Sequence, residues 1–164
     1  MYILSIDPGN EQTAYCLLDK DLRPIEKDKV VNEELLKIIH DLVHKHHIEH
    51  FAIEMVASYG LAVGKTVFET CFWIGRFYQK IHEYTSKEPT LIFRKDEKMS
   101  ICGSMQAKDG NIRRALIDMF AQHDFKNGKG TKKKPDWFYG FRADMWQAYA
   151  VGYTYYDKYI KGNR

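Results

Sequence analysis

The chain has 164 residues, of which 45% are hydrophobic and 14% aromatic, a composition typical of one compact domain that buries a sizeable core. We therefore expect a single domain over residues 1–164. The formal net charge of +3 at pH 7 is too small to identify a polyanionic partner by itself. The three cysteines are odd in number and widely separated, which fits reduced thiols in a cytosol better than a disulfide framework.

No segment of the sequence has the features of an export signal or a membrane span. Met1 is followed directly by a short strand-like run, without the basic start and the apolar stretch of a signal peptide. No apolar run approaches the roughly 18 residues of a membrane helix. We therefore expect a cytoplasmic protein with no membrane partner.

The pattern of apolar residues predicts strands and helices along the whole chain. Three strands come first, joined by short turns as in an antiparallel meander. Asn32 is then placed to cap the first helix. The only linker-like stretches are residues 94–110 and a lysine-rich loop before the last helix. In chain order, we predict strands at 2–7, 14–18 and 24–31, a helix from 32 into the histidine-rich segment 44–50, a strand at 50–56, a helix at 62–84, a strand at 90–93, and helices at 111–122 and 142–158.

This order of elements predicts an α/β fold. The expected architecture is a mixed five-stranded sheet flanked by helices, in which the three-stranded antiparallel meander continues into parallel strands through helical crossovers. In such a sheet, side chains at the carboxyl ends of neighbouring parallel strands meet at one edge, where ligands bind.

Two carboxylates are predicted to lie at this edge. Asp7 ends the first strand, and Glu54 interrupts the otherwise apolar stretch "FAIEMV" of the fourth. A charge inside a buried strand is costly without a partner. The alternatives are that Asp7 only forms a turn and that Glu54 only pairs with a Lys or an Arg.

A third carboxylate, Asp144, lies in the segment "FRADMWQAYAVGY". On a helix, Asp144 shares one face with Gln147, Ala148 and Val151. The small Ala148 and Gly152 would let this helix approach the sheet closely and bring Asp144 to the strand ends. Converging carboxylates repel one another unless a divalent cation neutralises them, and oxygen ligands suit Mg²⁺ or Mn²⁺.

Three motifs together resemble the RuvC-type Holliday junction resolvases, which have a ribonuclease H-like fold. "IDPGN" resembles the first-strand motif of this family, with the leading catalytic Asp at Asp7, and "FAIEMV" resembles the second motif, with the catalytic Glu at Glu54. "ADMWQAYAVG" resembles the last motif, a helix with two Asp residues three apart. Here Asp144 takes the first acidic position and Gln147 replaces the second; in the other register Asp144 is second and Phe141 stands first. One carboxylate is missing in either case.

The resemblance implies a metal-dependent endonuclease that resolves four-way (Holliday) and other branched DNA by paired nicking. It implies Asp7, Glu54 and Asp144 as catalytic metal ligands, Gln147 as a secondary ligand or water holder, and two Mg²⁺ ions that Mn²⁺ can replace. No small-molecule cofactor is expected. The short, divergent chain most resembles the resolvases of bacteriophages, which act in the cytoplasm of a bacterial host.

The resemblance also implies a homodimer, because a two-fold protein matches a two-fold junction. The candidate dimer element is the helix "TVFETCFWIGRFYQKI", in which four large aromatic residues exceed what one side of a small core needs. These residues are Phe68, Phe72, Trp73 and Phe77.

Several residues are candidates for contact with DNA. Tyr59 follows Glu54 near the place where the family carries an aromatic residue that enters DNA, and Lys108 resembles a family lysine that opens a helix near DNA, with Arg113 and Arg114 behind it. The segment "FKNGKGTKKKPDW" has five lysines and two glycines, a composition predicted to form a mobile basic loop that neutralises phosphates. Its clearest candidates are Lys132, Lys133 and Lys134, and Arg94, Lys95 and Lys98 can extend the basic surface. Some of the ten aromatic residues from 137 to 159 are candidates for stacking on bases, although most are expected in the core.

Two other functions remain open from the sequence. One keeps the fold and changes the substrate, to a ribonuclease H-like nuclease acting on flaps or RNA–DNA hybrids. The other is a non-catalytic protein that binds branched DNA, in which the missing carboxylate indicates lost activity.

Overall fold

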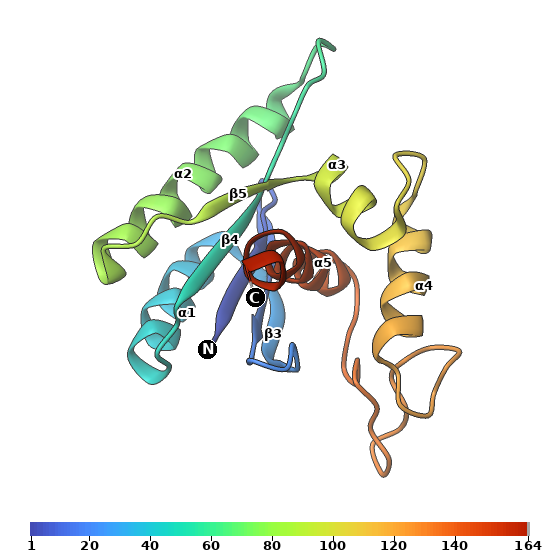
Figure 1. Ribbon diagram of the computed structural model, residues 1–164. Coiled ribbons are helices and arrows are strands. Elements are labelled where there is room, and N and C mark those ends of the chain that lie inside the picture. The colour runs from blue at the N-terminus through green and yellow to red at the C-terminus, as the bar shows by residue number, and fades with distance from the viewer. Residues whose placement is uncertain (164) are drawn as a thin grey trace.

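The computed structural model describes residues 1–163, which form one mixed sheet with helices on both faces (Figure 1). The strands are β1 (Ile3–Asp7), β2 (Gln12–Leu18), β3 (Pro24–Val31), β4 (His50–Met55) and β5 (Thr90–Phe93). The helices are α1 (Asn32–Lys45), α2 (Lys65–Thr85), α3 (Arg94–Glu97), α4 (Asp109–Phe120) and α5 (Met145–Tyr155). Short π-helical turns cover Lys98–Cys102 and Tyr156–Ile160, and a 3-10 turn covers Lys161–Asn163.

The sheet has the strand order β3-β2-β1-β4-β5. β2 pairs antiparallel with both β1 and β3, whereas β4 pairs parallel with both β1 and β5. The predicted meander and its parallel extension are therefore confirmed. Because β1, β4 and β5 run in the same direction, their carboxyl ends lie at one edge of the sheet.

Alternating side chains along the strands pack into two separate layers. Leu4 and Ile6 of β1 face α1 and α2, where they join a buried cluster with Leu35 and Phe77. Ile3 of β1 faces the other side and joins a cluster formed largely by α4, α5 and the segment between them. Figure 1 shows α1 and α2 on one side of the sheet and α5 on the other.

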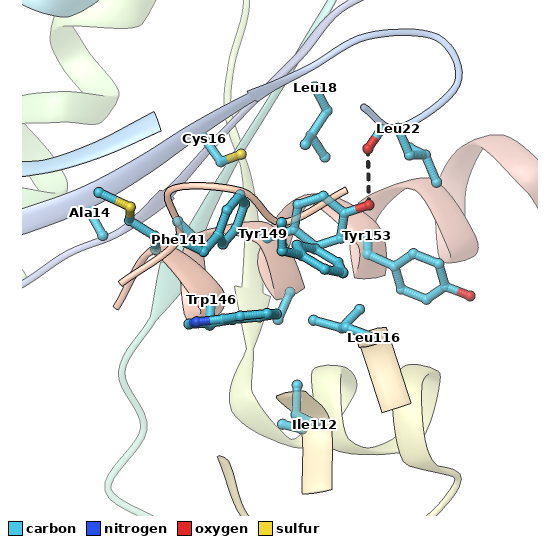
Figure 2. Close-up of a cluster of buried hydrophobic side chains, with 14 of the residues drawn as sticks. Ala14, Cys16, Leu18, Leu22, Ile112, Leu116, Phe141, Trp146, Tyr149 and Tyr153 are labelled. Carbon is cyan, nitrogen blue, oxygen red and sulfur yellow. Dashed lines mark hydrogen bonds between the residues drawn. The ribbon is translucent and has the colours of Figure 1, made fainter. Parts of the chain in front are cut away.

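The cluster on the α5 side is rich in aromatic side chains (Figure 2). Phe138, Phe141 and Tyr149 are fully buried there, and their rings meet edge to face. The Tyr149 hydroxyl donates a hydrogen bond to the Leu22 carbonyl at 2.9 Å, which satisfies its polar end inside the core. Many of the aromatic residues from 137 to 159 therefore belong to the core.

α5 lies against the sheet at Gly152. A Cβ atom at this position would lie 2.6 Å from Leu18 Cδ1 and 2.8 Å from Ser5 Oγ, so only glycine fits without a shift of its neighbours. Ala148, one turn earlier, is fully buried. The expectation that small residues bring this helix close to the strands is confirmed.

Several predicted element boundaries differ in the structure. Asn32 does not cap α1; its side chain accepts a hydrogen bond from Thr13 Oγ1 at 2.6 Å and donates one to the Gly9 carbonyl at 2.9 Å, so it fixes the turn after β1 instead. The last helix begins at Met145, not at residue 142. The stretch 94–110, which we expected to be a linker, contains α3 and a π-helical turn.

The lysine-rich segment is packed, contrary to the prediction that its composition cannot pack. The Asp136 carboxylate accepts hydrogen bonds from the backbone amides of Gln122, His123, Asp124 and Trp137 at 2.6 to 2.9 Å. Gly130 and Pro135 form a β-bridge. Burial alone would raise the pKa of Asp136, but these amide donors outweigh it and lower that pKa. Asp124 accepts hydrogen bonds from three further backbone amides of the loop, so two carboxylates organise a segment whose lysines 132–134 are exposed.

Two expectations drawn from composition can also be compared with the structure. All three cysteines are free, and Cys16 is buried in the α5-side cluster. Within residues 1–163, no helix combines the length and the apolar character that crossing a bilayer requires.

Candidate active site

Asp7 and Glu54 meet at the edge where the parallel strands end. β1 ends at Asp7, and its neighbour Ile6 pairs with Ile53, so Glu54 of β4 lies beside Asp7. Both side chains face the α5 side, because Glu54 shares a face with Ala52, which packs on Val151 of α5. The neighbouring Glu54 carboxyl group helps to raise the pKa of Asp7. The predicted convergence of these two acids is therefore present in the structure.

The environment of Asp7 opposes its ionisation. Burial has the largest effect, followed by the charge and the hydrogen bond of Glu54, and together they raise the pKa of Asp7 well above its usual range. The charges of Asp144 and Glu97 add to this rise. Two carboxylates this close do not both ionise readily unless positive charge compensates them.

Asp144 reaches the same edge from the end of α5, as the residue that precedes the helix. Its carboxylate accepts a hydrogen bond from Lys29 Nζ at 2.6 Å. Lys29 comes from β3 and pairs in register with Ala14, which on its other side pairs with Asp7. The structure thus brings the three predicted acids to one edge, with Asp144 held by a lysine that the sequence did not single out.

A fourth acid, Glu97, also lies at this edge and was missed in the sequence. It is the last residue of α3, and its side chain is completely buried. Burial and the neighbouring charge of Glu54 raise the pKa of Glu97 to about 8. Its run of charged neighbours, "RKDEK", is typical of a solvated surface, so composition gave no signal. Its position shortly after β5, the third of the parallel strands, was the one signal in the sequence that could have placed Glu97 at this edge.

Arg94 holds the polar side chains on the α3 side of the site. Its Nη1 donates to Glu97 Oε2 and to Gln147 Oε1, both at 2.5 Å, and its Nη2 contacts Asp109. The amide oxygen of Gln147, a candidate secondary ligand, is therefore engaged by Arg94. The role of Gln147 stays a prediction.

The charge and the oxygen donors of the site suit a divalent cation, but the side chains are not arranged to coordinate one. Among residues 1–163, no three His, Cys, Asp or Glu side chains are close enough together to hold a metal ion as they stand. Lys29 balances Asp144 and Arg94 balances Glu97, whereas Asp7 and Glu54 form no ion pair with a residue in the described range 1–163. Two uncompensated carboxylates match one hard divalent ion. Asp144 could join these two carboxylates as a ligand only by exchanging its Lys29 partner for the ion.

The residues predicted to contact DNA differ in their solvent exposure and in their contacts within the protein. Tyr59 follows β4 in a left-handed conformation and is 66% exposed, and Lys108 is exposed at the start of α4. The Arg113 guanidinium lies 4.5 Å from the centre of the Trp146 ring. Arg114 binds Asp118 and two carbonyls of the lysine-rich loop, so the structure gives it an internal role. Three loop lysines are exposed: Lys132, Lys133 and Lys134.

The aromatic residues of α2 divide between the surface and the core. Phe68 and Phe72 are 64% and 69% exposed. With Trp73 and neighbouring polar residues they line a surface groove of about 450 Å³. Phe77 is fully buried against the sheet and belongs to the core, so it is not part of the exposed aromatic surface of α2.

Comparisons with known proteins connect this chain to one fold. No protein-family model and no curated protein sequence matches it. Two solved structures of RuvC from Thermus thermophilus match over nearly the whole chain. The complex with a Holliday junction substrate aligns with a TM-score of 0.72 at 13% identity, covering 99% of this chain and 96% of that chain. The other RuvC structure aligns with a TM-score of 0.71 at 15% identity, covering 99% and 97%.

The chain has the RuvC fold. This agrees with the predicted mixed five-stranded sheet and flanking helices, and it is the fold of the proteins that the three motifs resemble. Because identity with RuvC is so low, the fold is what the two chains demonstrably share, and the roles of individual residues here depend on the local geometry.

Proposed function

We propose that the protein is a divalent-metal-dependent endonuclease that resolves four-way and other branched DNA by paired nicking. The observation that carries this proposal is the meeting of Asp7 and Glu54 at the carboxyl ends of β1 and β4, within a fold whose RuvC representative was solved with a Holliday junction substrate. Side chains at this edge are placed to act on a ligand bound across the strand ends.

In this proposal, Asp7, Glu54 and Asp144 hold Mg²⁺, or Mn²⁺ in its place, with two ions as the expected number. When bound, such ions supply activation of a water molecule and stabilisation of the leaving oxygen of a phosphodiester. A bound cation would favour the ionised form of Asp7, since its positive charge offsets the burial and the Glu54 charge that raise the pKa of Asp7. Gln147 remains a candidate to orient a water, provided that Arg94 releases its amide oxygen.

Basic residues around the site support binding to the DNA backbone. Lys108 and Arg113 are exposed on α4, which lies on the α5 side of the molecule (Figure 1). The exposed loop lysines 132–134 extend from the same side. Such contacts neutralise phosphates and position the duplex arms without reading sequence. Tyr59, on the loop after β4, is a candidate to stack on bases at the junction centre.

We also propose a homodimer in the cytoplasm of a bacterial host. Support for the dimer comes from Phe68 and Phe72, large aromatic side chains left exposed on the outer face of α2. Aromatic residues of this kind are typical of interface centres. A two-fold dimer would present two copies of the site to two symmetric strands.

The test is a comparison of branched and unbranched substrates at equal protein concentration. A fixed and a mobile four-way junction, a flap and an RNA–DNA hybrid are incubated with Mg²⁺ or Mn²⁺. We expect symmetric nicks in both junctions and little cutting of the hybrid. Preferred cutting of the hybrid or the flap would instead support the other nuclease function.

One observation favours a second candidate, a non-catalytic protein that binds branched DNA. Lys29 donates a hydrogen bond to Asp144, and Arg94 donates one to Gln147. In a site that has lost catalysis, basic side chains of this kind would take the place of the metal ions. Junction binding without nicks under either metal would establish this function in place of cleavage.

A further inference from the structure

Glu97 has a buried carboxylate oxygen without a partner. Its Oε2 accepts the hydrogen bond from Arg94, but its Oε1 is buried and has no hydrogen-bond partner within residues 1–163. The side chain has no exposed surface. A buried carboxylate oxygen left without a donor is costly, so its presence calls for a physical explanation.

Glu97 lies near Glu54, at the edge of the sheet where the parallel strands end. Ile92 of β5 pairs with Glu54 of β4, and the chain then passes directly from β5 into α3 at the edge where Asp7 and Glu54 lie (Figure 1). The charge of Glu54 is the main neighbouring charge acting on Glu97, and Glu97 in turn acts on Asp7. In the strand order β1-β4-β5, Glu97 follows the strand that lies on the other side of β4 from β1.

A purely structural pairing with Arg94 does not account for this arrangement. Arg94 also has Gln147 and Asp109 as acceptors, so it does not depend on Glu97 for its hydrogen bonds. A glutamine at position 97 would offer Arg94 the same acceptor oxygen without burying another negative charge beside Glu54. An ionisable carboxyl group at this position, with one oxygen free, favours a cation as the missing partner.

We propose that Glu97 is the fourth carboxylate of the divalent-ion site, with Oε1 as its ligand atom. This inference rests on the proposed function. Glu97 would supply, from α3, the carboxylate that is missing from the last sequence motif. In the two possible registers of that motif, the missing acid is replaced by Gln147 or by the buried Phe141. Arg94 acts as a positioning residue, because it fixes Oε2 and so keeps Oε1 directed away from itself.

The test measures Mn²⁺ binding to the full-length protein without DNA, by the electron paramagnetic resonance signal of free Mn²⁺. The variant Glu97→Gln keeps the size of the side chain and removes its charge. The matched control is Asp96→Asn, one residue earlier on α3, whose carboxylate pairs with Lys158 at 2.9 Å. Asp7→Asn reports on the site itself.

We expect Glu97→Gln to weaken Mn²⁺ binding by at least about tenfold, the scale of loss when groups that support a metal site are removed. Asp96→Asn should bind as the wild type does. If Glu97→Gln fails to fold, Glu97→Asp replaces it: this variant keeps the charge but withdraws the carboxylate by one methylene, and it should also weaken binding.

The outcomes separate this inference from the proposed function. Wild-type Mn²⁺ affinity in the folded position-97 variant, together with lost affinity in Asp7→Asn, would overturn the role of Glu97 and leave the endonuclease proposal standing. Unchanged affinity in Asp7→Asn as well would overturn both. An equal loss in Asp96→Asn would also overturn the role of Glu97, because a change of net charge on α3 would then suffice.

Discussion

Asp7 is buried beside Glu54, and burial together with the neighbouring carboxyl group favours the protonated form of Asp7. The raised pKa of Asp7 means that the folded protein binds a proton more tightly than the unfolded chain does. The stabilising effect of that proton is fully present below the pKa of an unfolded Asp, and it is lost as pH rises through the folded value. At neutral pH the pair is therefore a source of instability that a bound cation would relieve.

At the residue scale, Lys29 is expected to compete with a metal ion for Asp144. Replacing Lys29 by Met removes the ammonium 2.6 Å from this carboxylate and should tighten Mn²⁺ binding. A partly exposed ion pair is worth up to about 1 kcal/mol, which corresponds to about fivefold in affinity. Titration of the DNA-free protein with Mn²⁺ measures the change.

The control for Lys29→Met is Lys20→Met, at an exposed lysine paired only with its neighbour Asp21. This variant should bind Mn²⁺ as the wild type does. Weaker Mn²⁺ binding in Lys29→Met than in the control would contradict the competition and indicate that Lys29 instead holds Asp144 in place for the ion.

At the element scale, the site depends on how closely α5 approaches the sheet. Gly152→Ala would place a Cβ 2.6 Å from Leu18 Cδ1 and 2.8 Å from Ser5 Oγ. Overpacking of this kind costs about 1–3 kcal/mol, and the higher helix propensity of alanine returns about 1 kcal/mol. We expect a net loss in the free energy of unfolding, measured by urea denaturation.

Gly75 provides the matched control, because it lies inside α2 and a Cβ there would meet no atom within 4 Å. Gly75→Ala should therefore stabilise the protein by about 0.5–1 kcal/mol through helix propensity alone. If Gly152→Ala stabilised the protein as much as Gly75→Ala does, α5 would not be packed as tightly on β1 and β2 as the structure has it.

The same elements explain which parts of the site could be predicted. Asp7 and Glu54 were predictable for two reasons. A carboxylate at the end of an apolar strand, or within one, costs free energy unless it has a partner or a function, and parallel pairing places the ends of neighbouring strands together. Asp144 was found through its motif, although the helix begins one residue after it.

Other parts of the site could not be predicted, for physical reasons. Glu97 lies in a charged run that resembles solvated surface, and only tertiary packing buries it. Lys29 lies on the polar edge strand β3, where nothing local distinguishes it from its neighbours. The lysine-rich loop looked unable to pack because its order comes from hydrogen bonds between backbone amides and two carboxylates, Asp124 and Asp136, which no apolar pattern in the sequence reveals.

At the scale of the whole molecule, paired nicking requires two sites related by symmetry. Phe72→Glu places a charge at the centre of the exposed aromatic face of α2 and should dissociate the proposed dimer, weakening it by at least about tenfold if Phe72 is an anchor of the interface. Sedimentation over a range of concentrations measures the change. The single protomer should unfold as before, because Phe72 is 69% exposed.

Glu83→Gln, on the same helix but nearer its end, serves as the control for Phe72→Glu and should leave the association unchanged. A wild-type chain that sediments as a monomer at every concentration would contradict the dimer, and so would a Phe72→Glu variant that associates as the wild type does.

The central claim is that the carboxylates at the ends of β1 and β4 carry out the cleavage of branched DNA, and Asp7→Asn tests it most directly. Asparagine removes a charge that burial and Glu54 both oppose, so the variant should fold and should bind a four-way junction with wild-type affinity. In Mg²⁺ or Mn²⁺ it should produce no nicks, whereas Asp21→Asn, at an exposed distant position, should cut normally. Full nicking by Asp7→Asn would contradict the claim.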